Sequence, residues 1–179
     1  FVPFAMMASR EGEFGYNMEI IVPADSPVQR IEDLKGRTIA FTAPTSNSGF
    51  KAPSALLASQ FNMLAERDFK PAFSGRHDNS IIGVANKDYD AAAIANSVMA
   101  RMVARNAVDP ARIRSIYRSP PFPTTGYGHV YNLRPELQAK IREAFFSFPW
   151  DGSALLAEFQ KSQPPQEKFI PITYKEHWA

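Results

Sequence analysis

The stretch that says most about the fold is residues 42–51, Thr-Ala-Pro-Thr-Ser-Asn-Ser-Gly-Phe-Lys. The apolar run Thr38–Phe41 comes just before it and predicts a buried strand. The apolar segment Ala52–Phe61 comes just after it and predicts a helix. The small polar residues and the glycine of the intervening loop are Ser46, Asn47, Ser48 and Gly49.

This loop has the composition of an anion-binding turn. Ser and Asn favour helix N-caps, and the first turn of a helix carries N–H groups without intrahelical partners. Together with the helix dipole and the two hydroxyls, these donors can hold a tetrahedral oxyanion. The same residues also fit an ordinary strand-to-helix turn with a serine cap, so both interpretations stay open. If Ser48 is the cap, Pro53 should bend the first turns of the helix.

Strand and helix patterns alternate along the rest of the chain. Expected strands cover 1–8, 16–23, 38–41, 70–74, 89–95, 112–118 and 127–132, and expected helices cover 30–36, 52–61, 64–69, 80–86, 97–105, 134–148 and 151–161. The alternation from Thr38 to Tyr117 predicts a mainly parallel, doubly wound α/β unit. The prolines of Ser119–Thr125 argue against a regular element, and we expect a crossover segment there.

A second polar turn, Gly75–Asn79, lies between an expected strand and an expected helix. Ligands of such sheets bind outside the carboxyl ends of the strands, where both polar turns should lie. His77 could add an imidazole donor to the serine loop, although a histidine there also fits a capping or surface role. Asp78 and Asn96 fit simple helix caps.

Composition and motifs exclude several classes of protein. Lysine plus arginine number 20 and aspartate plus glutamate 18, and the charges are scattered, which argues against nucleic acid as the main partner. The absence of cysteine excludes disulfides and thiol chemistry. The three histidines lack paired ligand spacing, and neither G-x-S-x-G nor a P-loop occurs. We therefore expect no catalytic residue, no metal and no cofactor.

The order of several short segments resembles the substrate-binding proteins of phosphonate and phosphite ABC importers. The segments are Asp25–Pro27, Ile31–Phe41, Pro44–Gly49, Ser74–Asp78, Val84–Asn86 and Asp90–Ala93. The resemblance covers roughly residues 16–148. It implies an α/β fold of the type II periplasmic-binding-protein class, with two doubly wound lobes joined by a hinge. It also implies that Ser46, Asn47 and Ser48 bind phosphonate oxygens, as a Ser-Thr-Ser triplet does in the family, and that His77 reaches the same oxygens.

The chain departs from the family pattern in three ways. Asn47 replaces the middle threonine of the triplet, which exchanges a hydroxyl for an amide donor. Residues 119–126 contain no acid, whereas aminoethylphosphonate binders carry an aspartate there, so we expect phosphite, a small alkylphosphonate or phosphate. The family also has a further stretch before the residues that match. We therefore expect 24–118 to form a complete lobe two, and 1–23 with 119–179 to form the remainder of an incomplete lobe one.

These expectations describe a periplasmic solute-binding component of an ABC importer. It would bind a tetrahedral oxyanion between two lobes through Ser46, Asn47, Ser48, Gly49 and His77, and deliver it as a monomer to a permease in the inner membrane. Two alternatives remain. One is a phosphatase-like or phosphotransferase-like α/β enzyme, which would need a nucleophile with an activating base. The other is the ligand-sensing subunit of a signalling receptor.

Overall fold

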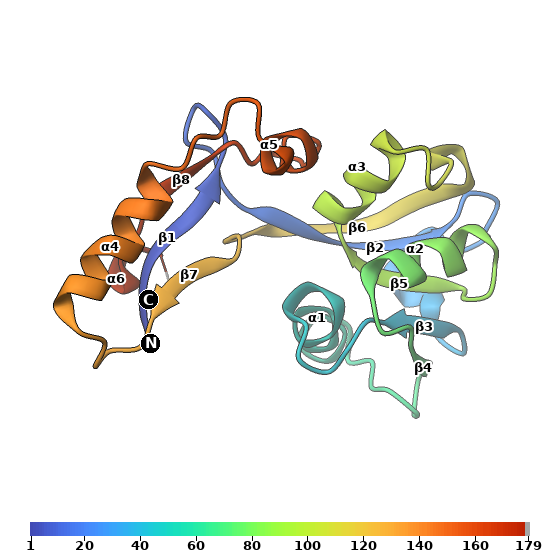
Figure 1. Ribbon diagram of the computed structural model, residues 1–179. Coiled ribbons are helices and arrows are strands. Elements are labelled where there is room, and N and C mark those ends of the chain that lie inside the picture. The colour runs from blue at the N-terminus through green and yellow to red at the C-terminus, as the bar shows by residue number, and fades with distance from the viewer. Residues whose placement is uncertain (178–179) are drawn as a thin grey trace. The chain divides into compact units, whose positions relative to one another are not determined.

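The computed structural model describes residues 1–177 and divides the chain into two compact units (Figure 1). Unit 1 contains Phe1–Tyr16 and the chain from Phe122 onward, and unit 2 contains Asn17–Pro121. No helix described within residues 1–177 is both long and apolar enough to cross a bilayer.

Unit 2 is built on a five-stranded sheet with strand order β4-β3-β5-β2-β6. Its elements are β2 (Tyr16–Pro23), the 3-10 helix η1 (Ile31–Leu34), β3 (Thr38–Phe41), the π-helical turn η2 (Asn47–Lys51), α1 (Ala52–Phe61), β4 (Lys70–Phe73), α2 (His77–Ala85), β5 (Ala91–Ala95), α3 (Asn96–Ala104), the 3-10 helix η3 (Pro110–Arg112) and β6 (Ile113–Phe122). Strand β3 runs parallel to β4 and β5, whereas β2 runs antiparallel to β5. The predicted mainly parallel α/β unit is confirmed.

The core of unit 2 covers both faces of this sheet. All five residues of β5 are buried, as expected for a central strand with helices on both faces. Ala92 and Ile94 share one face of β5 and pack with the buried side of α2 and with Met102 of α3. Phe41 points to the other face, where it lines an apolar pocket together with Ser54 and Ala58 of α1. This arrangement places the starts of α1, α2 and α3 after β3, β4 and β5 respectively.

A proline marks β4 as an edge strand. The N–H of Lys70 donates to the carbonyl of Arg37 at 2.9 Å, so that N–H points toward β3. Because N–H directions alternate along a strand, the nitrogen of Pro71 faces away from the sheet, where its missing hydrogen costs no ladder bond. Pro71 therefore fits the edge and protects it against pairing with another strand.

Two expectations about secondary structure are wrong. The segment Leu64–Phe69 forms a turn instead of a helix. The carboxylate of Asp68 accepts the N–H of Leu64 at 2.8 Å, and Glu66 has a φ of 64°, which a helix does not tolerate. The segment expected to be irregular from Ser119 begins as regular strand, because β6 continues to Phe122. Proline is compatible with this outcome, since its fixed φ suits an extended edge strand.

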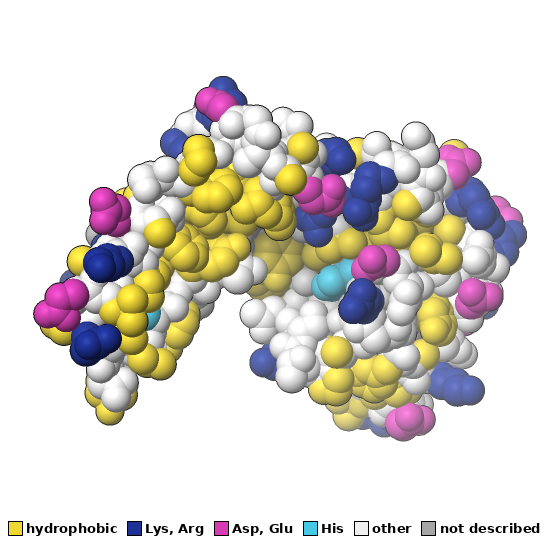
Figure 2. All heavy atoms as spheres, viewed as in Figure 1, with side chains coloured by type: hydrophobic (Ala, Val, Ile, Leu, Met, Phe, Trp, Pro, Cys, Tyr) yellow, Lys and Arg dark blue, Asp and Glu magenta, His cyan; other side chains and the backbone are white. Residues whose placement is uncertain are grey.

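Unit 1 is held together by a three-stranded sheet and an aromatic cluster. Its elements are β1 (Val2–Ala8), β7 (Gly126–His129), α4 (Pro135–Phe146), α5 (Ala154–Phe159), β8 (Lys168–Pro171) and α6 (Tyr174–His177). Strand β1 lies between β7 and β8 and is antiparallel to both, and α4 contacts β1 and β8. Phe145 and Phe169 have ring centroids 4.8 Å apart, and Trp150 lies 5.0 Å from Phe169. Hydrophobic side chains also gather over this unit in Figure 2.

Adjacent isoleucines of α2 test how the helix is packed. Ile81 is 0% exposed and Ile82 is 42% exposed. We expect Ile81→Ala to lower the free energy of unfolding by about 2–5 kcal/mol, because it leaves a cavity in the core. Ile82→Ala makes the same chemical change at the surface and should cost less than about 1 kcal/mol. Urea unfolding of the two variants measures the difference, and equal costs would contradict the described helix face.

Candidate anion-binding site

The loop after β3 folds back on itself through its backbone. The N–H of Thr42 donates to the carbonyl of Gly49 at 3.0 Å, and the N–H of Lys51 donates to the carbonyl of Ser46 at 3.0 Å. In an α-helix the carbonyl of Gly49 would instead accept from residue 53, which is a proline without an N–H. Pro53 thus leaves the carbonyl of Gly49 to Thr42, and the first turn is the wider π-helical one.

Ser46, rather than Ser48, is the N-cap of this turn. Its backbone is extended, with φ −71° and ψ 131°, and its Oγ accepts the N–H of Gly49 at 3.0 Å. The hydroxyl hydrogen of Ser46 remains available to a further acceptor. Asn47 is exposed, and Ser48 is only 2% exposed. The N–H groups of Asn47 and Ser48 lie in the first turn, where no intrahelical acceptor exists.

Residue 49 must be a glycine because its backbone lies close to the side chains of Thr42 and Ser46. A Cβ built on Gly49 would lie 2.0 Å from Thr42 Oγ1 and 2.8 Å from Ser46 Oγ. Thr42 is buried, and within residues 1–177 its Oγ1 has no hydrogen-bond partner. The glycine therefore allows the turn to lie directly on the end of β3.

His77 lies at the first position of α2 and has a defined role for one ring nitrogen. Its Nδ1 accepts the N–H of Ala95 at 3.1 Å, so the neutral ring carries its proton on Nε2. The half-buried imidazole has a pKa below its usual value, mainly because burial disfavours the charged form. The Asp78 carboxylate opposes this shift in pKa, and the Arg101 guanidinium adds to it. His77 thus offers Nε2–H as a neutral donor.

The three parallel strands bring the two polar turns to one edge of the sheet. The N–H of Gly75 donates to the carbonyl of Thr42 at 2.9 Å, which joins the turn after β4 to the loop after β3. Strand β5 contacts the η2 turn, and its last residue, Ala95, holds His77. Ser46 and Gly49 are hydrogen-bonded to each other, whereas His77 is joined to this edge by its hydrogen bond with the N–H of Ala95. The part played by Ala95 was missed in the sequence, because only strand register reveals it.

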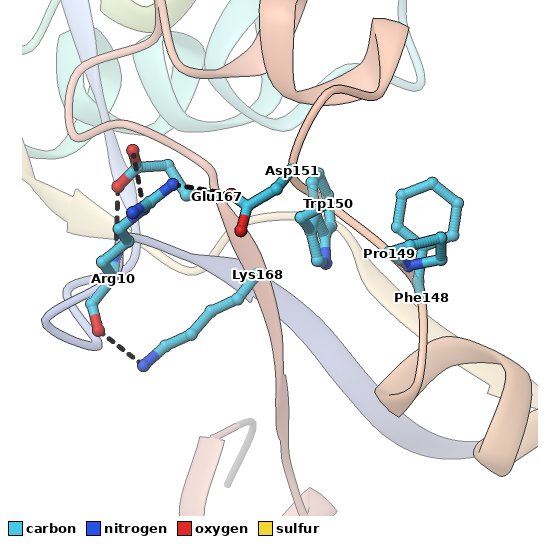
Figure 3. A pocket seen from close by; sticks show the side chains of 7 residues that line it. All are labelled: Arg10, Phe148, Pro149, Trp150, Asp151, Glu167 and Lys168. Carbon is cyan, nitrogen blue, oxygen red and sulfur yellow. Dashed lines mark hydrogen bonds and ion pairs between the residues drawn. The ribbon is translucent and has the colours of Figure 1, made fainter.

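Two pockets elsewhere in the described residues are poorly suited to an oxyanion. In unit 1 a pocket of about 440 Å³ is lined by Arg10, Phe148, Pro149, Trp150, Asp151, Glu167 and Lys168 (Figure 3). Its cations are already engaged: the Arg10 guanidinium lies 2.9 Å from Asp151, and Lys168 Nζ donates to the Arg10 carbonyl at 2.7 Å. In unit 2 the pocket of about 410 Å³ beside α1 is lined mainly by apolar side chains, among them Phe41, Phe50, Phe69 and Phe73. Within residues 1–177 no group of three or more acidic or histidine side chains is placed to hold a metal ion.

The chain is similar to a known protein family and to curated members of it. The model of the family described as "ABC transporter, phosphonate, periplasmic substrate-binding protein" matches residues 1–178. The chain is 28% identical over 149 residues to the phosphonates-binding periplasmic protein of Escherichia coli (strain K12), an alignment that covers 81% of this chain and 44% of that protein. It is 27% identical over 149 residues to the phosphate-import protein PhnD of Mycolicibacterium smegmatis, with 79% of this chain and 46% of that protein covered.

A solved structure gives the same picture at the level of the fold. The binding protein component of an ABC phosphonate transporter from Pseudomonas aeruginosa superposes with a TM-score of 0.79 at 25% identity. The superposition covers 96% of this chain and 57% of that chain. The chain spans less than half the length of the two curated relatives.

The state of His77 predicts a pH dependence of stability. Because its pKa is lowered in the folded chain, the unfolded chain binds more protons between the folded pKa and the usual value of about 6.5. The contribution of neutral His77 to the free energy of unfolding is complete above about pH 6.5 and is lost as the pH falls toward the folded pKa. His77→Asn keeps an acceptor for Ala95 N–H but cannot titrate. We expect the free energy of unfolding to fall less between pH 7.5 and 5.5 in this variant than in the unsubstituted chain. Urea unfolding at several pH values measures this, and parallel curves would contradict it.

Proposed function

Since the chain belongs to the family of periplasmic substrate-binding proteins of phosphonate ABC transporters, we propose that it binds a tetrahedral oxyanion at the carboxyl edge of the unit 2 sheet. The ligand would be held by the loop residues Ser46, Asn47, Ser48 and Gly49, with His77 as a further donor. The observation that carries this proposal is the convergence of the Ser46-capped turn and the His77 turn at one sheet edge.

The site would bind its ligand through hydrogen bonds rather than through a matching positive charge. First-turn N–H groups, serine hydroxyls and a neutral Nε2–H are the donors that this sheet edge would offer, and backbone donors bind anions without a full counter-charge. A hydrogen bond to a charged group contributes about 1.5–3 kcal/mol. Several such bonds would support a dissociation constant near 1 μM, which corresponds to about −8 kcal/mol.

Two observations support a class of ligand: the names of the relatives, and the absence of a carboxylate from residues 119–126. One relative is named for phosphonates and another for phosphate, which share a tetrahedral oxyanion. Residues 119–126 of this chain contain no carboxylate that could pair with an aminoalkyl group. We therefore propose phosphite, a small alkylphosphonate or phosphate as the ligand. The complete second lobe would be residues 24–118, with 1–23 and 119–179 belonging to lobe one.

Binding without turnover is the second part of the proposal. The named relatives are binding or import proteins of transporters rather than enzymes. His77 is the only imidazole at this sheet edge within the described residues, and its Nδ1 is occupied by Ala95 N–H. The nitrogen that remains carries a proton and cannot take one from a serine. The chain would act in the periplasm as a monomer that presents its ligand to a membrane permease.

Calorimetric titration tests this function directly. We expect methylphosphonate, phosphite or phosphate to bind with micromolar affinity, and sulfate to bind differently from the best of these. Ser48→Ala and Ser46→Ala should each weaken that binding by about tenfold or more, because each removes a donor or the cap that shapes the turn. Ser59→Ala, at an exposed position of α1 away from the loop, is the matched control and should leave the affinity unchanged. Equally weak heats for all four anions, or hydrolysis of p-nitrophenyl phosphate, would overturn the proposal.

A further inference from the structure

Strand β5 extends past the end of β3, and this leaves a donor that no strand can satisfy. The register pairs Ala40 with Ala92, so Phe41, the last residue of β3, is level with Ala93. The N–H of Ala95 therefore lies beyond β3. His77 Nδ1 accepts it at 3.1 Å, in the place that a backbone carbonyl would take in a longer strand.

On the other side of β5, a second side chain continues the ladder in the same way. The antiparallel pairing of β2 with β5 ends at Met18 and Ala95. The next pair would be Asn17 with Asn96, but Asn96 is already the first residue of α3. Its side-chain Oδ1 accepts the N–H of Asn17 at 2.8 Å, and Asn96 is only 6% exposed. His77 and Asn96 thus hold the same two-residue segment from opposite sides.

Asn17 extends this arrangement to the point where the chain passes between its two units. The division between the units falls at Tyr16 and Asn17 on the way into unit 2. Asn17 Nδ2 donates to the carbonyl of Ser119 at 2.8 Å, and Ser119 Oγ accepts the N–H of Met18 at 3.0 Å. Arg118 donates to Asn17 Oδ1 at 2.9 Å. The strand that enters unit 2 and the strand that leaves it are therefore bonded to each other beside Asn96.

We propose that Asn96 is a positioning residue for His77. By anchoring the start of α3 to Asn17, it fixes the Ala95 N–H that selects the Nε2–H form of the imidazole and orients it. Asp78 of α2 and Arg101 of α3 are the charged groups that act on the ring, in opposite directions. The part of this inference that concerns oxyanion affinity depends on the proposed function, whereas the part that concerns the imidazole does not.

The imidazole nitrogen shifts of His77 in ¹⁵N-labelled protein test the inference without any ligand. In the unsubstituted chain we expect an unprotonated Nδ1 and a protonated Nε2 at pH 8. Asn96→Ala should shift the ring toward a mixture of the two forms and move its pKa back toward the usual value. Asn96→Asp keeps an oxygen acceptor for Asn17 N–H and should restore the single form at pH 8. Asn86→Ala, at an exposed position after α2, is the matched control and should change neither.

Binding of methylphosphonate is the second readout. Asn96→Ala should weaken it by about three- to tenfold, which is the effect expected when one hydrogen bond that positions His77 is lost. A folded Asn96→Ala variant with an unchanged imidazole form would overturn the proposal. A normal imidazole response in a chain that binds none of the anions would refute the proposed function and leave the positioning role standing.

A measurement on the unsubstituted chain applies if Asn96→Ala does not fold. The N–H groups of Ala95 and Asn17 should show similar protection from hydrogen exchange. The reason is that the bond from Ala95 to His77 and the bond from Asn17 to Asn96 both depend on the segment Ala95–Asn96. Protection of Ala95 alone, with Asn17 exchanging freely, would contradict the proposed link.

Discussion

Parallel strands that end at one edge of a sheet leave backbone donors and acceptors that no neighbouring strand can pair. Buried groups of this kind are costly unless something bonds to them. In unit 2 the groups beyond the ends of β3 and β5 are paired by nearby loop and side-chain atoms. Thr42 pairs with Gly49 and Gly75 beyond β3, and Ala95 pairs with His77 beyond β5. These bonds pair the N–H groups at the strand ends. They do not involve the first-turn N–H groups of Asn47 and Ser48 or the Nε2–H of His77. The candidate site consists of these remaining donors.

The electrostatics of this edge differ from those of the charged pocket in unit 1. There, Arg10 is paired with Asp151 and lies 3.7 Å from Glu167, so an anion would have to compete with carboxylates for the same guanidinium. At the unit 2 edge the donors are neutral, and the lowered pKa of His77 keeps the ring uncharged near neutral pH. Fixed dipoles can bind an anion without a fully desolvated ion pair.

Local pattern was enough to predict much of the fold. The alternation of strand and helix patterns from Thr38 to Tyr117 predicted a mainly parallel α/β unit, which the strand pairing confirms. The order of the motifs predicted the family, which the comparisons confirm. The predicted α/β class of type II periplasmic binding proteins is confirmed as well, by a solved family member. The five candidate residues lie in two turns at one sheet edge, and their role as ligands stays a prediction.

Two features that the sequence did not predict are local, and a third depends on a contact between distant strands. The segment Leu64–Phe69 is a turn instead of the expected helix because Glu66 has a left-handed φ of 64°. Ser46 rather than Ser48 caps the turn after β3, and Pro53, which has no N–H, leaves the Gly49 carbonyl free for Thr42. The bond between His77 and Ala95 depends on how far β5 extends past β3, and register of that kind cannot be read from either segment alone.

Backbone amide shifts on addition of methylphosphonate to the ¹⁵N-labelled chain show whether the anion binds at the carboxyl edge of the unit 2 sheet. We expect the largest changes on the amides of Asn47, Ser48 and Gly49 and on the His77 ring. This expectation would be contradicted if these signals stayed fixed while those of Arg10, Trp150 and Lys168 moved, because the anion would then occupy the charged pocket of unit 1.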